Sequence, residues 1–238
     1  MSGESLQSFK DFCKDKKILL VGNSLTALQR EQASLIDSYD IVLRFGKGVL
    51  PGYENYIGSK TDVWMTGQFR LGMRKYLPDN VICLYQPPYR IDNPEIPEWD
   101  HIQMFTPEEL LELTKEFATG DERLSAGAQV SLFLKRKIKT YKELNYINFD
   151  FFQQKTGFID KFHGITSEAT SWHLPLTPPK FIDGLKQGDG CHKTETEKKV
   201  FQSVFDDRVN FIGLSYKRPT YIKNPNAAWD HVRLRPNE

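Results

Sequence analysis

His192 has a side chain that can do acid–base chemistry. It lies in the stretch GDGCHKTETEKKVF, where a glycine-containing loop leads into a predicted helix, and Glu197 follows five residues later. A neutral imidazole accepts a proton near pH 7, so this histidine fits the deprotonation of a hydroxyl group. Glu197 fits a supporting role for the loop or the helix. An exposed loop histidine without a catalytic role fits the same local pattern.

The stretch VGNS at residues 21–24 predicts a turn that binds an anion. A strand over residues 17–22 ends in Gly22, Asn23 and Ser24, and a predicted helix over 27–37 follows. Free backbone N–H groups at such a turn attract phosphate, and the Asn23 amide suits a ribose or phosphate contact. The pattern is neither G-x-G-x-x-G nor a Walker A motif. An ordinary strand–helix turn capped by asparagine fits it equally well.

Arg44 is the second candidate for contact with an anion. It follows the apolar run 41–43, which Asp40 precedes, and the carboxyl end of a strand is where an open α/β sheet binds its ligands. The residue type and position fit a phosphate ligand and a structural ion-pair partner equally well.

Alternating strands and helices must position these residues. The pattern predicts one α/β domain over residues 1–238, with a Rossmann-like, mostly parallel sheet flanked by helices. Thr106, followed by Pro107 and two glutamates, is a strong helix start. The glycine-rich stretch 46–58 and the proline-rich stretch 86–99 are predicted loops. The predicted strands are 17–22, 41–43, 62–66, 80–85, 101–105, 144–151 and 209–213, and the helices are 27–37, 106–117, 126–139 and 194–206.

Three stretches of the chain resemble the sialyl motifs of the sialyltransferases, glycosyltransferase family 29. Residues 18–65 resemble the large motif: a strand, a GNS turn, a helix, IDSYDIVLRF, a glycine-rich loop and GSKTD. Residues 124–127 (LSAG) and 147–150 (INFD) are similar to the small motif, and His192 with Glu197 to the very small motif. The middle motif matches either Phe162-His163 or Trp172-His173, and we include His173 among the candidate contacts.

The resemblance implies a GT-A-like variant of the fold and a single displacement with inversion. His192 would then be the base, and Ser125, Gly127 and the following helix N-terminus would compensate the charge of the leaving phosphate. The implied co-substrate is a nucleotide sugar, of cytidine type first and uridine type next, with no other cofactor. There is no Asp-x-Asp motif, so we expect no metal requirement. The implied nucleotide contacts are Gly22, Asn23, Ser24, Arg44, Ser125, Ala126, Gly127 and His173.

Three departures from the family pattern concern the donor site and the origin of the chain. Gly46 stands where the large motif has asparagine, and Ala126 interrupts the Ser-Thr-Gly turn, so the donor sugar stays open. The cysteines that pair between the large and small motifs in animal enzymes are absent, which fits a viral or bacterial relative.

The amino-acid composition excludes few classes of binding partner. The chain has 238 residues, 39% hydrophobic and 26% charged, with a net charge of +1, so it shows no overall drive toward polyanions. It has no apolar run of about 18 residues, as a membrane span needs, its N-terminal stretch is polar and its three cysteines are widely spaced. We therefore expect a cytoplasmic enzyme without a membrane span.

Two alternatives to a saccharide-modifying enzyme stay open. The C-terminal stretch SYKRPTYIKNPNAAWDHVRLRPNE interleaves basic and aromatic residues, which suits phosphate contacts and base stacking. The acceptor would then be a modified base in phage DNA. The other alternative is a nucleotide-binding module that keeps the turn but has lost catalysis.

Overall fold

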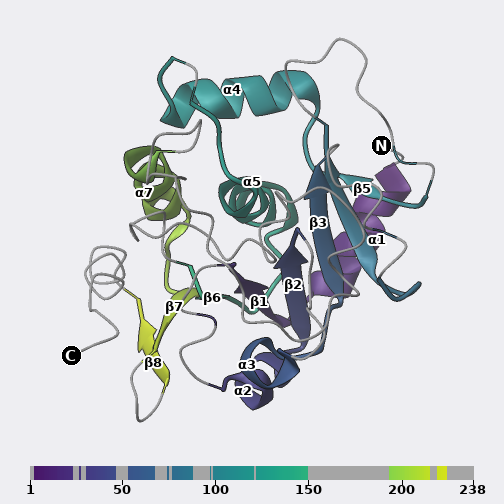
Figure 1. Cartoon of the computed structure of the whole chain (residues 1–238). Coiled ribbons are helices and arrows are strands. Elements are labelled where there is room, and N and C mark those ends of the chain that lie inside the picture. Colours follow the sequence, from purple (N-terminus) through teal and green to yellow (C-terminus); the bar gives the residue numbers. More distant parts are fainter. Residues whose placement is uncertain are drawn as a thin grey trace.

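Strand β1 (Lys17–Val21) lies inside an eight-stranded sheet with the order β5-β4-β3-β2-β1-β6-β7-β8 (Figure 1). The computed structural model describes residues 3–23, 27, 31–46, 53–67, 74, 77–87, 97, 99–120, 122–149, 193–214 and 219–223. The other strands are β2 (Ile41–Phe45), β3 (Val63–Gly67), β4 (Ile82–Gln86), β5 (Ile102–Gln103), β6 (Glu143–Ile147), β7 (Val209–Leu214) and β8 (Pro219–Ile222).

The central strands are apolar runs because helices cover both faces of the sheet. Ile18 and Leu20 pack into one core, whereas Leu19 and Val21 pack into the other. Seven strands are parallel, and β8 alone runs antiparallel, against β7. The prediction of an α/β fold with a mostly parallel sheet is confirmed.

The helices form two layers around this sheet. The larger layer contains α4 and α5, which lie above the strands in Figure 1, whereas the short helices α2 and α3 lie below them. Its members are α1 (Gly3–Cys13), α4 (Pro107–Phe117), α5 (Ala126–Phe133), the π-helix η3 (Leu134–Ile138) and α7 (Thr194–Val204). The opposite layer has α2 (Ala33–Asp37) and α3 (Glu54–Ile57).

Helix α4 begins where the sequence predicts, because its start is encoded locally. The Thr106 hydroxyl accepts from the Glu109 N–H at 3.2 Å, and the Glu109 carboxylate accepts from the Thr106 N–H at 2.8 Å. This capping box satisfies two backbone groups and fixes the first turn. Ser125 caps α5 in the same manner, with its hydroxyl accepting from the Ala128 N–H at 3.1 Å.

The helix predicted over residues 27–37 is wrong in its extent, since α2 begins only at Ala33. The Gln32 N–H donates to the distant Asn55 carbonyl at 3.0 Å, and the Gln32 side chain donates to the Ala27 carbonyl. These bonds replace the helical pattern around Gln32. Residues 24–26 and 28–30, where the helix expected after Asn23 would begin, lie outside the described residues.

Three further predicted stretches differ from the structure, and one strand was not predicted. The stretch 46–58, predicted as loop, contains α3, which ends at Ile57 and is followed by Gly58 with a φ of 69°. The strand predicted over 144–151 ends at Ile147, because Asn148 takes a φ of 59°, outside the extended region. The strand predicted over 101–105 is reduced to Ile102 and Gln103. Strand β8 was not predicted, and most of the proline-rich stretch 86–99 lies outside the described residues.

The order of the strands creates a switch point between β1 and β6. From β1 the chain adds β2, β3, β4 and β5 in one direction, and then returns to place β6 on the other side of β1. Open α/β sheets bind ligands outside the carboxyl ends of the strands at such a point. Gly22 follows β1 and Asn148 follows β6, so both residues lie there.

Candidate functional site

Gly22 lies in close contact with the end of β6. Its N–H donates to the Ile147 carbonyl at 2.8 Å, and a Cβ at this position would lie 2.3 Å from the carbonyl oxygen of Asn148. Only a glycine allows the two strand ends to approach this closely. The next residue, Asn23, donates its side-chain amide to the Phe45 carbonyl at 3.4 Å, which links the turn to the end of β2.

We expect Gly22→Ala to destabilise the fold by about 3 kcal/mol, because the clash is with backbone rather than with a movable side chain. Urea denaturation measures the change. Gly67→Ala is the matched control, since Gly67 also ends a strand of this sheet but its Cβ would meet only the Gln86 carbonyl at 3.7 Å. Equal stability of the two variants would contradict the close-contact role of Gly22.

Ser125 and Glu197 join two segments that are far apart in the sequence. The Glu197 carboxylate accepts from the Ser125 N–H at 3.0 Å and from its hydroxyl at 2.7 Å. Both side chains are buried, and only 2% of Glu197 is exposed. Burial raises the pKa of Glu197 to about 7, although the two bonds from Ser125 lower it. The turn 125–127 is thereby fixed to the first turn of α7.

A second contact ties the start of α7 to the same region. The Thr196 hydroxyl donates to the Glu122 carboxylate, which also accepts from the Thr119 hydroxyl. Hydrogen bonds from Thr196 and Thr119 lower the pKa of Glu122. Lys193, the first residue of this segment that the structure describes, accepts from the Glu197 N–H at 3.0 Å. Two separate bonds therefore hold the beginning of α7 against residues 119–125.

Arg44 is directed toward the backbone of its own domain. Only 2% of it is exposed, and its guanidinium donates to the carbonyls of Lys60 at 2.9 Å and Ile57 at 2.7 Å. Burial lowers its pKa to about 10, whereas Asp37 and Asp62 raise it. Of the two sequence interpretations, these contacts favour the structural one, with backbone carbonyls in place of an ion pair. The structure therefore gives no support for a contact between Arg44 and a nucleotide.

Other residues of the large motif also stabilise the fold. Asp37 accepts from the backbone N–H groups of Ser59 and Lys60, both at 3.0 Å, and the Lys60 ammonium donates to the Tyr39 carbonyl. Asp62 accepts from the Val42 N–H at 2.7 Å. The ID-x-x-D and GSKTD stretches thus connect β2 to the segment that leads into β3.

Asn148 and Phe149 belong to the site but were not predicted as site residues. Phe149 lies against Gly127, where a Cβ would be 2.7 Å from its ring, and it contacts Phe45 edge-on with centroids 6.0 Å apart. The Asn148 side chain is 2% exposed and has no hydrogen-bond partner. The stretch INFD was noted for its resemblance, but nothing in the residue types indicates an unpaired amide.

The structure brings together Gly22, Asn23, Ser125, Ala126 and Gly127 around the ends of β1 and β6. The predicted residues Ser24, His163, His173 and His192 lie outside the described residues. Within the described part of the chain, no group of three or more His, Cys, Asp or Glu residues forms a candidate metal site.

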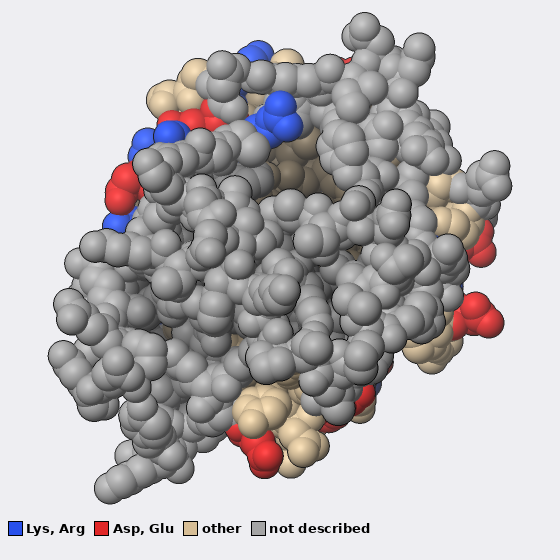
Figure 2. Space-filling model, in the orientation of Figure 1, with Lys and Arg blue, Asp and Glu red and all other residues tan. Residues whose placement is uncertain are grey.

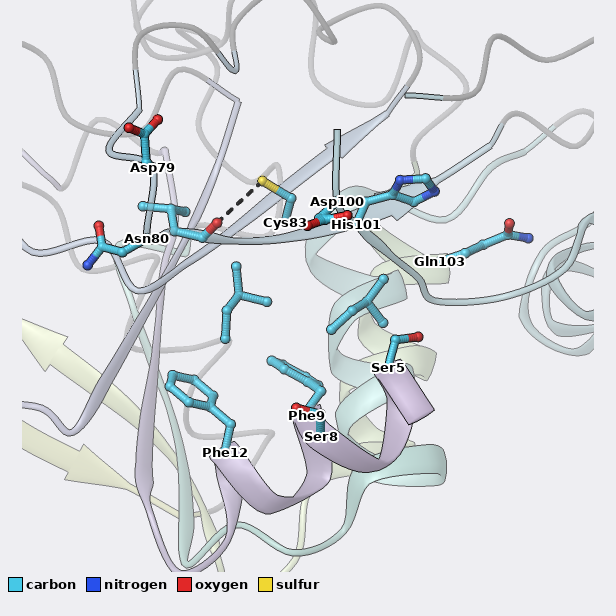
Figure 3. A pocket seen from close by; sticks show the side chains of 13 residues that line it. Ser5, Ser8, Phe9, Phe12, Asp79, Asn80, Cys83, Asp100, His101 and Gln103 are labelled. Atoms are coloured by element: carbon cyan, nitrogen blue, oxygen red, sulfur yellow. Dashed lines mark hydrogen bonds between the residues drawn. The ribbon is translucent and has the colours of Figure 1, made fainter. Parts of the chain in front are cut away.

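A cavity of about 700 Å³ lies away from this site (Figure 3). Phe9 and Phe12 of α1 form one wall, and residues 79–83 and 100–103, before and within β4 and β5, form the other. Cys83 donates its thiol to the Val81 carbonyl at 3.6 Å. These are the amino ends of the strands, opposite to the switch-point edge.

Comparison with known proteins supports the family resemblance over the N-terminal part of the chain. The glycosyltransferase family 29 (sialyltransferase) model matches residues 11–76, which include β1, β2, β3 and the Gly22 turn. This part of the chain is thus similar to the sialyltransferases of glycosyltransferase family 29, as its sequence motifs predict. No curated protein sequence matches it.

A solved structure of similar fold supports the architecture of this chain. A mammalian sialyltransferase in complex with Gal-beta-1-3GalNAc-ortho-nitrophenol has a TM-score of 0.50 and 18% identity, over 85% of this chain and 71% of that one. A second structure of a mammalian sialyltransferase has a TM-score of 0.48 and 18% identity, over 83% and 68%. Among the described residues, no helix is long and apolar enough to cross a membrane.

Proposed function

We propose that the protein transfers a sugar, with inversion, from a pyrimidine-nucleotide donor to a hydroxyl of a saccharide, with His192 as the base. The bond between Ser125 and Glu197 carries the proposal. It holds the first turn of α5 next to the start of α7, and His192 directly precedes Lys193 in the sequence. The base and the phosphate-binding turn then come from neighbouring segments.

The turn at Ser125 suits a leaving phosphate. Helix α5 begins with Ala126 and Gly127, and the first N–H groups of a helix have no partners within it. Such groups and the helix dipole stabilise negative charge without a metal ion. We propose on this ground that transfer needs no divalent cation, with a cytidine nucleotide as the first candidate donor and a uridine nucleotide as the second.

Charges on the described surface do not favour a DNA acceptor. On the face shown in Figure 2, acidic and basic side chains alternate at the upper left, where α4 and α7 lie in Figure 1. The pairs include Lys115 with Glu112 at 2.7 Å and Lys198 with Glu195 at 2.9 Å. From the basic C-terminal stretch, Lys223 donates to the Asp207 carbonyl at 2.8 Å, next to β8.

A thermal-shift series tests the donor proposal. Mono- and diphosphates of cytidine, uridine, guanosine and adenosine are compared with and without magnesium. We expect one pyrimidine nucleotide to raise the melting temperature independently of magnesium, since a ligand at about 100 times its Kd adds about 2.7 kcal/mol. No shift with any nucleotide, or a shift that requires magnesium, would contradict the proposal.

The acceptor is then tested with the nucleotide sugar of the donor class so identified. Gal-beta-1-3GalNAc is the first acceptor to assay, because the solved mammalian sialyltransferase binds it as a nitrophenol conjugate. Transfer to this disaccharide or to another saccharide supports the proposal. Nucleotide binding without transfer to any acceptor would indicate a binding module, and transfer only to duplex DNA would replace the saccharide.

A further inference from the structure

Among the buried amides of the described residues, Asn148 is the one that lacks a partner for both of its polar atoms. Neither its Oδ1 nor its Nδ2 has a hydrogen-bond partner, and only 2% of the residue is exposed to solvent. The other buried amides with an unpaired atom each bond through the second one: Gln32 to Ala27, Gln86 to Pro87 and Phe105, Gln129 to Leu124 and Asn145 to Asn210.

Keeping such a residue is costly to the fold. A buried amide without partners loses its bonds to water and gains nothing in return. Asn148 also takes a φ of 59°, a left-handed conformation that glycine adopts without strain. Neither packing nor backbone conformation therefore requires an asparagine here. Unpaired buried polar groups and left-handed residues are found where a ligand supplies the missing interaction.

The position of Asn148 identifies the ligand. It follows β6 at the switch point, its carbonyl lies against Gly22, and the next residue, Phe149, lies against Gly127. Asn148 is thus between the two turns proposed to hold the donor nucleotide. We infer that the Asn148 side chain reads the edge of the pyrimidine base of that nucleotide, so the inference rests on the proposed function.

The chemistry of the amide favours a base over the rest of the nucleotide. An amide offers one acceptor and a donor group side by side, and the edge of cytosine or uracil presents a donor next to an acceptor. Asparagine pairs with a nucleic-acid base in the same bidentate way. A phosphate only accepts hydrogen bonds and would leave Oδ1 unpaired. Cytosine and uracil both fit, since the amide satisfies either by rotating about its side-chain bond.

The test compares the dissociation constants of cytidine monophosphate, uridine monophosphate and ribose 5-phosphate by calorimetry. Ribose 5-phosphate keeps the sugar and the phosphate but lacks the base. We expect Asn148→Gly to weaken binding of the preferred nucleotide about tenfold, or about 1.4 kcal/mol. Its Kd for ribose 5-phosphate should stay unchanged. The melting temperature of the ligand-free variant should not fall, because the glycine removes an unpaired buried amide and adopts the φ without strain.

Two further variants make the result specific. Asn148→Asp keeps the size of the side chain and tolerates the left-handed conformation, but replaces the donor by an acceptor, so it should weaken nucleotide binding at least as much. Lys139→Gly is the matched control, because Lys139 is exposed, has a φ of 64° and lies before the opposite end of β6. This control should leave all three constants unchanged.

The outcomes separate the inference from the proposed function. A wild-type protein that binds neither pyrimidine nucleotide overturns both. A wild type that binds one of them, together with an Asn148→Gly variant of equal affinity, overturns the inference alone. The inference also fails if ribose 5-phosphate loses affinity to the same extent, or if the ligand-free Asn148→Gly protein melts several degrees lower.

Discussion

Replacing His192 by alanine should lower the rate of sugar transfer by about 10²- to 10⁴-fold, which is the usual contribution of a general base. The acceptor hydroxyl would then have to lose its proton to water. Melting temperature and nucleotide affinity should stay close to those of the wild type, because the phosphate is proposed to contact the Ser125 turn instead. The measurement is kcat with the donor nucleotide sugar and the saccharide acceptor at saturating concentrations.

Cys191→Ala is the matched control for this experiment. Cys191 directly precedes His192, and its thiolate would be a nucleophile. Its replacement should leave kcat unchanged. Equal activity of His192→Ala and wild type would remove His192 from the mechanism, and loss of activity in the cysteine variant alone would indicate a covalent intermediate instead of a direct displacement.

Replacing Glu197 by glutamine should remove a pH-dependent loss of stability. In the folded protein the pKa of Glu197 is about 7, mainly because the carboxyl is buried, against an ordinary value of 4.5. The folded state therefore holds this proton more tightly than the unfolded state between pH 4.5 and 7. Stability falls as the pH rises through this range, by about 3 kcal/mol at most, and does not change further above pH 7 for this group.

Glutamine keeps the shape and stays neutral, with its amide able to bond the Ser125 N–H and hydroxyl. The difference in unfolding free energy between Glu197→Gln and wild type should thus grow by about 3 kcal/mol from pH 4.5 to pH 7.5. Urea denaturation at several pH values measures it. Other carboxyls with a lowered pKa, such as Glu116 and Asp206, change the stability with pH in the opposite direction. Their contribution is the same in both proteins and therefore drops out of this difference. A difference that does not vary with pH would contradict the raised pKa.

The elements that the sequence predicted well are those encoded by their own residues. The Thr106 capping box starts α4 through side chains within one turn, and KILLV is apolar because β1 is buried on both faces. The left-handed Asn148, by contrast, ends β6 where an apolar and aromatic run predicted a longer strand. Strand β8 forms by pairing with β7, and its sequence alone, with Pro219 at its start, gave no sign of a strand.

In the candidate site, too, only the features encoded by local residues were predictable from the sequence. The Gly22 turn and the Ser125 turn were predicted from motifs, and the structure places them around the same strand ends. The direction of a side chain was not predictable in this way. Arg44 lies near the carboxyl end of β2, where a ligand-binding residue is expected, yet its guanidinium donates to carbonyls of a segment more than ten residues away. Similarly, the Asn148 amide is unpaired because no distant segment places a hydrogen-bonding group beside it, and the local sequence does not reveal this.

The position of β1 between β2 and β6 also has a consequence for the order of folding. One neighbour of β1 in the sheet, β2, follows it closely in the sequence. The other neighbour, β6, comes much later, since Lys17 pairs with Glu143. Contacts between distant residues form slowly because a long loop must close first. In a chain emerging from the ribosome, β1 to β5 are thus synthesised before β6, so the two turns proposed to hold the donor nucleotide meet late. Nucleotide binding would then report that folding is complete.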